Sequence, residues 1–211
     1  MKAAVSRNPS WRRRPRQRRA RLTFESILDA AVRILKCQGA SSITTNRIAQ
    51  VAGVSIGSLY QYFPDKSAIF VALHGRHLDE IDRVIQSSLV ECASSSLEVL
   101  IGATVESMVN AHQADPELYQ VLATEVPHRA DGTQPFAVRL HNAFKLAIAS
   151  HTQELGREAL RKGRNLDKVA FVVAHMVESL SHGALFRRPA ALSLQEAKAE
   201  AVRAILLYLR T

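Results

Sequence analysis

Length and composition set the first limits on this chain. Its 211 residues, 47% hydrophobic and 6% aromatic, can bury a core as one large or two modest domains, and they favour a helical protein. No apolar run of about 18 residues is expected, which would exclude a membrane span. Cys37 and Cys92 lack metal-type spacing, so we expect buried, reduced thiols in a cytoplasmic protein, with a thiol-based sensor as the alternative.

The net charge of +9 is concentrated at the N-terminus. Nine of the 28 basic residues and no acidic residue lie within residues 1–21, which leaves 19 basic and 19 acidic residues beyond them. Two prolines and the lack of apolar periodicity predict a disordered, arginine-rich arm there. Such an arm can neutralise phosphates or enter a DNA minor groove, and a merely solvated tail is the alternative. No apolar segment follows, so no export signal is complete.

The first predicted helix follows the arm. Thr23 is a suitable N-cap, Glu25 lies in the first turn, and Gly39 ends the helix. One face is apolar, and we expect it to pack across the next two helices. This face consists of Phe24, Ile27, Leu28, Ala31, Ile34 and Leu35.

Two short helices joined by a tight turn come next. Thr44 and Thr45 offer hydroxyl N-caps to the first, and Gly53 follows it where positive φ is needed. Ser55 is the N-cap of the second helix, which Pro64 ends. A helix, a short turn with glycine and a second helix form a helix-turn-helix, so we expect binding in the DNA major groove.

The second of these helices is expected to reach base edges through its first residues, Ser55, Ile56, Gly57 and Ser58. Ile56 can touch a thymine methyl group but cannot hydrogen-bond to guanine, which limits direct readout. Gly57 contributes by having no side chain, because the backbone can then approach the DNA closely. The weak base-reading face favours an added role for the arm and for DNA shape.

The segment from Ile48 to Lys66 resembles the DNA-binding core of the TetR family of bacterial repressors. With the preceding helix, the resemblance covers roughly Arg21 to Leu78. It implies an all-α fold, with an N-terminal three-helix DNA-binding domain and a larger C-terminal helical domain for ligand binding and dimerisation. Ile56 departs from the family, which often has a polar or basic side chain there. The matching residues are Ile48, Ala49, Ala52, Gly53, Val54, Ser55, Gly57, Leu59, Tyr60, Tyr62, Phe63 and Lys66.

The resemblance also implies phosphate contacts from five residues, and a groove contact from Asn46 or Arg47. Tyr60 fits a core position equally well, because an aromatic side chain at helical spacing is usually buried. Lys66 suits a phosphate near the start of the next helix. The predicted DNA-binding residues are Arg21, Thr44, Thr45, Asn46, Arg47, Ser55, Ile56, Gly57, Ser58, Tyr60, Tyr62 and Lys66.

Helical patterns continue to the C-terminus. Asp65 caps a long helix that contains the expected domain boundary, near residue 80. Later helices are predicted at 97–112, from 115 onward, and at 136–162, 166–186 and 193–209. We therefore expect an arm at 1–21, a DNA-binding domain at 22–80, and an effector-binding and dimerisation domain at 81–211.

The last two predicted helices are apolar on two faces, so both faces need cover. One face suits the core of the subunit. The other suits a second copy, which predicts a homodimer held by a four-helix bundle, with a wholly internal helix as the alternative. Two-fold symmetry in turn matches a palindromic operator in double-stranded DNA.

In TetR-like proteins a small molecule binds among the central helices and releases the DNA, which requires that it prefer the non-binding conformation. An apolar set in this chain suits a hydrophobic or amphipathic effector, although each member also fits simple core packing. The predicted effector pocket consists of Met108, Tyr119, Phe136, Phe144, Phe171 and His175.

Eight histidines raise the question of metal binding or catalysis. His175 and His182 lie about two turns apart with Glu178 between them, but no third histidine or cysteine motif accompanies them. The sequence contains no nucleophile elbow, phosphate loop or dinucleotide fingerprint. We therefore predict no metal site, no cofactor and no enzymatic activity.

The sequence as a whole predicts a dimeric transcriptional regulator, a repressor that a small effector releases from its operator. The alternative is a sequence-tolerant architectural DNA-binding protein, whose arm dominates binding and whose C-terminal domain only dimerises or binds a protein partner.

Overall fold

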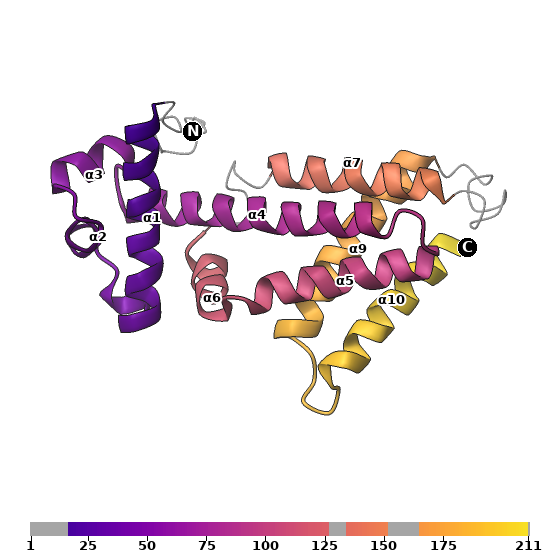
Figure 1. Ribbon diagram of the computed structural model, residues 1–211. Coiled ribbons are helices and arrows are strands. Elements are labelled where there is room, and N and C mark those ends of the chain that lie inside the picture. Colours follow the sequence, from indigo (N-terminus) through magenta and orange to yellow (C-terminus); the bar gives the residue numbers. More distant parts are fainter. Residues whose placement is uncertain (1–16, 127–133, 152–164, 211) are drawn as a thin grey trace, which may run out of the picture. The chain divides into compact units, whose positions relative to one another are not determined.

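The computed structural model describes residues 17–126, 134–151 and 165–210, which form helices and no β-strand (Figure 1). The predicted all-α class is confirmed. The helices, labelled as in Figure 1, are α1 (Arg18–Gln38), the 3-10 turn η1 (Ala40–Ser42), α2 (Thr45–Ala52), α3 (Ile56–Tyr62), α4 (Lys66–Glu91), α5 (Leu97–Gln113), α6 (Pro116–Glu125), α7 (Gln134–Ser150), α9 (Leu166–Phe186) and α10 (Leu194–Arg210).

The chain divides into two compact units. The first comprises Met1–Leu78 and Asp115–Thr133, and the second comprises Asp79–Ala114 and Gln134–Thr211. This division differs from the continuous domains expected at 22–80 and 81–211, because α6 belongs with the N-terminal helices. Helix α4 runs through the division without a break.

Helix α6 joins the first unit through apolar packing. Leu118, Leu122 and Val126 are buried in the same core as the apolar face of α1. The Lys36 ammonium also lies 2.8 Å from the carboxylate of Asp115, the N-cap of α6. Neither contact follows from local sequence, since the two helices are far apart in the chain.

Helix α1 begins at Arg18, five residues before Thr23, its predicted N-cap. The Thr23 hydroxyl instead donates to the Arg19 carbonyl oxygen at 3.2 Å, a bond within the helix. Arginine and alanine are good helix formers, so the helix extends into what was expected to be the arm. All six residues of the predicted apolar face are buried, which confirms that part of the prediction.

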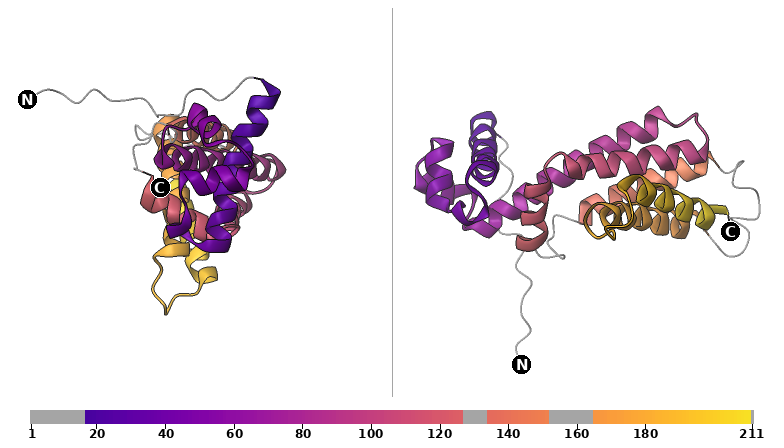
Figure 2. Two further views of the ribbon diagram at one scale, coloured as in Figure 1. Left: turned by 90° about the vertical axis from the view of Figure 1, so that its left-hand side faces the viewer. Right: turned by 90° about the horizontal axis from the view of Figure 1, so that it is seen from below.

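The second unit is built around α9, which packs against α5, α7 and α10. Helices α9 and α10 lie side by side in the right-hand view of Figure 2. By length and composition α9 qualifies as a membrane span, contrary to the expectation that no such segment exists, and 39% of its most apolar window is buried inside the chain. A core helix meets the same criterion, so length and composition alone are weak grounds for a span.

Two ion-pair sets join helices within the second unit. Arg139 on α7 contacts Asp79 and Asp82 on α4 at 2.9 and 2.7 Å, and the buried Lys198 on α10 lies 2.5 Å from Glu106 on α5. These contacts fasten α4 to α7 and α5 to α10.

Two further expectations are corrected. Cys37 is exposed and Cys92 is half-buried, because Cys37 lies on α1 away from its apolar face. Helix α7 ends at Ser150 rather than near residue 162, and residues 152–164 lie outside the described residues.

Candidate nucleic-acid interface

The predicted caps of the helix-turn-helix are confirmed. The hydroxyl of Thr44 accepts a bond from the Arg47 amide at 3.2 Å and begins α2. Gly53 ends α2 with φ 69°, a left-handed conformation that strains other residues. The hydroxyl of Ser55 accepts from the Ser58 amide at 3.0 Å and begins α3. These local bonds fix the turn between α2 and α3.

Tight apolar packing behind α3 holds this helix in place. Leu59 and Phe63 are fully buried, and the Phe63 ring lies 4.8 Å from that of Phe24 on α1. The rings of Tyr62 and Phe24 pack edge to face with their centres 6.4 Å apart, and Tyr62 is half-buried. Burying a side chain as large as that of Leu59 or Phe63 stabilises the fold by about 1.5–3 kcal/mol.

The opposite side of α3 is exposed and carries few polar groups. Ile56 is 38% exposed, Gly57 is exposed, and a Cβ at position 57 would meet only the Ser55 hydroxyl, at 3.9 Å. Tyr60 is 47% exposed, which decides between the two expectations for it: it is a surface residue. Its hydroxyl lies 3.3 Å from that of Thr45, so both reach the same part of the surface.

Two arginines near the junction of α1 and α2 are held by neighbouring amide groups. The Arg47 guanidinium donates to Gln50 at 2.8 Å and to Gln38, the last residue of α1, at 3.4 Å. Arg33 on α1 donates to the Val51 carbonyl oxygen at 3.3 Å. Arg47 therefore helps to join α1 to α2 in addition to any contact with DNA, whereas Thr44 and Asn46 stay exposed.

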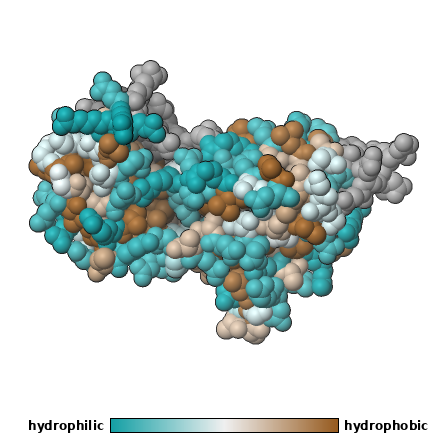
Figure 3. Space-filling view, viewed as in Figure 1, coloured by the Kyte–Doolittle hydropathy of each residue, from teal (hydrophilic) through white to brown (hydrophobic). Residues whose placement is uncertain are grey.

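Further basic residues flank the motif on both sides. The Lys66 ammonium lies 5.3 Å from the centre of the Phe70 ring at the start of α4, where the Asp65 carboxylate accepts the Ala68 amide at 2.8 Å. At the beginning of α1, Arg18, Arg19 and Arg21 are exposed on the helix, and this end of α1 is strongly hydrophilic (Figure 3). Arg21 was expected in the disordered arm, but it lies within α1.

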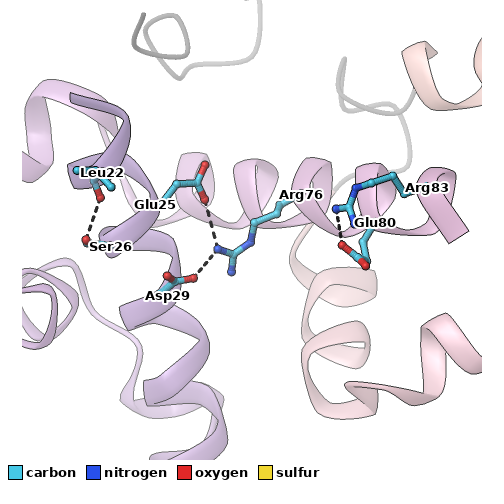
Figure 4. Close-up of polar contacts among 7 residues, drawn as sticks. All are labelled: Leu22, Glu25, Ser26, Asp29, Arg76, Glu80 and Arg83. Atoms are coloured by element: carbon cyan, nitrogen blue, oxygen red, sulfur yellow. Dashed lines mark hydrogen bonds and ion pairs between the residues drawn. The ribbon is translucent and has the colours of Figure 1, made fainter. Parts of the chain in front are cut away.

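One acidic patch on α1 is neutralised within the first unit. The Arg76 guanidinium on α4 lies 2.6 Å from the Asp29 carboxylate and 3.5 Å from that of Glu25 (Figure 4). The same view shows Glu80 paired with Arg83 further along α4. Arg76 fastens α1 to α4, and it was not singled out from the sequence because its partners lie about 50 residues away.

The predicted effector-pocket residues are divided between the two units and differ in burial. Met108, Phe136 and Phe144 are buried in the second unit. Tyr119 belongs to α6 in the first unit, where its ring lies 5.9 Å from that of His77. Phe171 is 53% exposed and stacks on the exposed His175, with ring centres 4.2 Å apart.

The described part of the chain contains no group of three or more histidine, cysteine, aspartate or glutamate side chains that could hold a metal ion. His175 bonds to the Phe171 carbonyl oxygen at 2.8 Å, within its own helix. Glu178 is exposed as a residue, although desolvation of its carboxyl group raises its pKa and the nearby His175 opposes the rise.

Comparison with known proteins identifies the family. A protein-family model described as "Bacterial regulatory proteins, tetR family" matches residues 27–73. A second family model, described as "Tetracyclin repressor-like, C-terminal domain", matches residues 96–209. The second match alone covers more than half of the chain. The chain therefore belongs to the TetR family of bacterial transcriptional regulators, as its helix-turn-helix indicated.

Individual relatives are more distant. The nucleoid occlusion factor SlmA of Haemophilus ducreyi is 31% identical over 99 residues, 46% of this chain and 48% of SlmA. The regulator AcrR of Shigella flexneri is 42% identical over 57 residues, 27% of this chain and 26% of AcrR. The chain thus matches half or less of the length of these two relatives.

A solved structure with the same fold is that of the multidrug binding protein EbrR complexed with imidazole, with a TM-score of 0.57 and 16% identity over 85% of this chain and 93% of EbrR. At this identity the likeness concerns the fold alone. SlmA is described as a nucleoid occlusion factor and AcrR as a transcriptional regulator, and neither description names an enzyme.

Proposed function

We propose that this regulator is a cytoplasmic homodimer that binds a palindromic operator and represses transcription until a hydrophobic or amphipathic effector binds its second unit. The observation that carries the DNA-binding part is the exposed side of α3, where Ile56, Gly57 and Tyr60 face solvent while Leu59 anchors the helix. The repressor-like description of the matching C-terminal family model supports repression.

Uncovered apolar side chains on the last two helices support the homodimer. Phe171 on α9 is 53% exposed and Leu207 on α10 is 58% exposed. A second copy related by a two-fold axis would bury both, at about 25 cal/mol for each Å² of apolar surface removed from water. We expect the double variant Phe171→Glu, Leu207→Glu to sediment as a monomer. Val90→Glu, on α4 and 75% exposed, is the matched control and stays dimeric if α9 and α10 form the interface.

Buried aromatic and sulfur-containing side chains support an effector site inside the second unit. Met108, Phe136 and Phe144 are each less than 5% exposed, and such side chains suit an apolar ligand body. EbrR, described as a multidrug binding protein, has the same fold. The effector acts only if it prefers the conformation that does not bind DNA.

Helix α6 offers a route from effector to DNA. Only Ala114 and Asp115 separate α5 in the second unit from α6, whose Leu118 and Leu122 are buried in the core of the first unit. A displacement of α5 is therefore passed along the backbone into the core that holds α3. Asp115 also pairs with Lys36 at the end of α1, so the same displacement disturbs that ion pair.

Selection of binding sites from random DNA by the full-length protein tests this function. We expect one palindromic site whose half-sites lie about one helical turn, 10 base pairs, apart or a multiple of it. Its affinity should exceed that for random DNA by about a thousandfold or more. Equal affinity for all sequences would contradict the proposal.

A second candidate, a sequence-tolerant chromosome-associated protein, is favoured by the similarity to SlmA and by the basic arm. Removing residues 1–16, which carry six basic side chains, separates the two candidates. For an operator-binding regulator, we expect weaker binding and a smaller salt dependence with specificity retained. Loss of all DNA binding would favour the architectural function.

A further inference from the structure

Several polar side chains without an assigned role meet where α5 crosses α9 in the second unit (Figure 1). His112 on α5 is 7% exposed, and its ring lies 6.4 Å from that of Phe186 on α9. The ring of His182 lies 5.1 Å from the same Phe186 ring. Ser181, which directly precedes His182, is 1% exposed. Two imidazoles and an aromatic ring therefore meet here, and the buried hydroxyl of Ser181 belongs to the adjoining residue of α9.

The hydroxyl of Ser181 is the least satisfied of these groups. It is buried and has no hydrogen-bond partner among the residues that the structure describes. Thr104 on α5 is equally buried, but its hydroxyl donates to the Leu100 carbonyl oxygen at 2.7 Å. Native proteins rarely keep a buried polar atom without a partner, so Ser181 requires an explanation that Thr104 does not.

The electrostatic surroundings of the two histidines favour an anion. Burial lowers the pKa of His182, and the charges of Arg187 and His112 lower it further. Burial also lowers the pKa of His112, although its bond to the Met108 carbonyl oxygen at 2.8 Å opposes this. Because that bond needs a proton on Nδ1, protonating His112 adds an Nε2–H donor. The positive charges that disfavour protonation of His182 would attract a bound anion.

The acidic side chains on the same two helices have other partners. Glu106 on α5 pairs with Lys198 at 2.5 Å, and Asp167 on α9 pairs with Lys145 at 2.7 Å. Glu178 lies one turn before His182, but the charge that acts on its carboxyl group is that of His175. These carboxylates therefore leave the positive surroundings of His182 in place.

We propose that His112, Ser181 and His182 bind the carboxylate group of an amphipathic effector, with Phe186 against its apolar part and Arg187 supplying further positive charge. This inference rests on the proposed function, because it names the chemical class of effector that the second unit takes. Two imidazoles and a hydroxyl supply the donors that a carboxylate needs when it leaves water.

Matched amphiphiles test the head group. The full-length protein is titrated with decanoate, decanol and decyltrimethylammonium, and binding is followed by calorimetry and by the melting temperature. We expect decanoate to bind at least tenfold more tightly than decanol, since hydrogen bonds to a charged group are the stronger ones. Equal or tighter binding of decanol or of the ammonium compound, or no binding of decanoate, would overturn the proposal.

Variants test the location. Ser181→Ala removes an unsatisfied hydroxyl, so we expect an unchanged or higher melting temperature without ligand and about tenfold weaker decanoate binding. His182→Gln should weaken decanoate binding at least as much. Thr104→Val is the control: it removes a satisfied hydroxyl, lowers the melting temperature and leaves decanoate affinity unchanged. Unchanged affinity in Ser181→Ala and His182→Gln would exclude this site.

Operator release is measured in the same samples. It distinguishes failure of the carboxylate site from failure of the proposed effector-released repressor. If decanol binds as tightly as decanoate and both release the operator, the carboxylate site is wrong and the effector-released repressor stands. If decanoate binds in a Ser181-dependent way but the operator stays bound, the site stands and release by this effector class is wrong.

Discussion

Among the residues that the structure describes, the first unit buries a core that is apolar throughout, whereas the second unit buries six polar or charged side chains. Apolar side chains do not titrate, so the packing behind α3 does not itself depend on pH. Burying a polar group is costly unless it has a hydrogen-bond or ion-pair partner. The stability of the second unit should therefore depend on protonation and on bound ligands. The six are Ser88, Thr104, His112, His151, Ser181 and Lys198.

Most of these buried groups have internal partners. His151 bonds to the carbonyl oxygens of Ala147 and Ser95 at 2.8 and 3.0 Å, and Ser88 accepts from the Ser107 hydroxyl at 3.2 Å. Lys198 has its ion pair with Glu106. The contrast between the units can therefore be tested by substituting buried groups whose partners are known.

The largest expected effect is on the apolar core. Phe63→Ala should lower the free energy of unfolding by about 3–5 kcal/mol and abolish operator binding, because it leaves a cavity beneath α3. Urea unfolding and a DNA-binding assay measure the two effects. Tyr60→Ala, on the exposed side of the same helix, is the control and should change stability by less than about 0.5 kcal/mol. A loss below 1 kcal/mol for Phe63→Ala would refute rigid packing behind α3.

The buried ion pair should respond asymmetrically. Glu106→Gln leaves the Lys198 ammonium buried without its counter-charge, and we expect a loss of about 1–3 kcal/mol, below the full value because Glu106 is half-exposed. Lys198→Met removes the buried charge and should stay within about 1 kcal/mol of the parent protein. Chemical denaturation compares the two variants. A larger loss for Lys198→Met would reverse our view of this pair.

A pH dependence should arise in the second unit. Burial lowers the pKa of His112 below its ordinary 6.5, so the unfolded chain takes up the proton more readily than the native protein. Stability is therefore full above pH 6.5 and is lost as the pH falls through 6.5 toward the lower native pKa. Urea unfolding from pH 8 to pH 5 should show this loss. It should shrink in His112→Gln but persist in His175→Gln, whose ring is exposed; equal curves for the three proteins would argue against a buried neutral His112.

Substitution of Gly57 should affect the stability of α3 and its binding to DNA in opposite directions. A Cβ at this position meets only ordinary contact with the Ser55 hydroxyl, so Gly57→Ala should stabilise α3 by about 0.5 kcal/mol. The added methyl group should nevertheless weaken operator binding, because it stands on the exposed side of α3. Gly102→Ala, in α5 with open space around it, is expected to stabilise without affecting the DNA. Undiminished binding by Gly57→Ala would show that this backbone does not approach the DNA.

The smallest expected effect concerns exposed charges. Arg76→Ala breaks the contacts with Glu25 and Asp29, and we expect a loss of about 0.5 kcal/mol that disappears in high salt. Thermal unfolding at low and high salt measures it. Arg83→Ala, whose pair with Glu80 lies within one exposed stretch of α4, should show no such change. A salt-independent loss for Arg76→Ala would point to packing by its side chain.

The local sequence determined the helix-turn-helix, because each of its limits is set by a bond over a few residues. Thr44 and Ser55 cap their helices, and Gly53 takes the positive φ that ends α2. The apolar pattern of the sequence also placed α9 at 166–186, and the structure adds that the Asn165 side chain accepts the Lys168 amide. Local sequence failed as a guide at Thr23, since a hydroxyl can bond within a helix as readily as at its start.

Only the tertiary structure decided which surfaces meet. Helical spacing could not tell whether Tyr60 is buried, because an aromatic side chain fits either side of a short helix until its neighbours are known. The place of α6 in the first unit, the partners of Arg76 and the unsatisfied hydroxyl of Ser181 depend on residues far away in the chain. Burial and partnership are properties of packed helices, and no local pattern contains them.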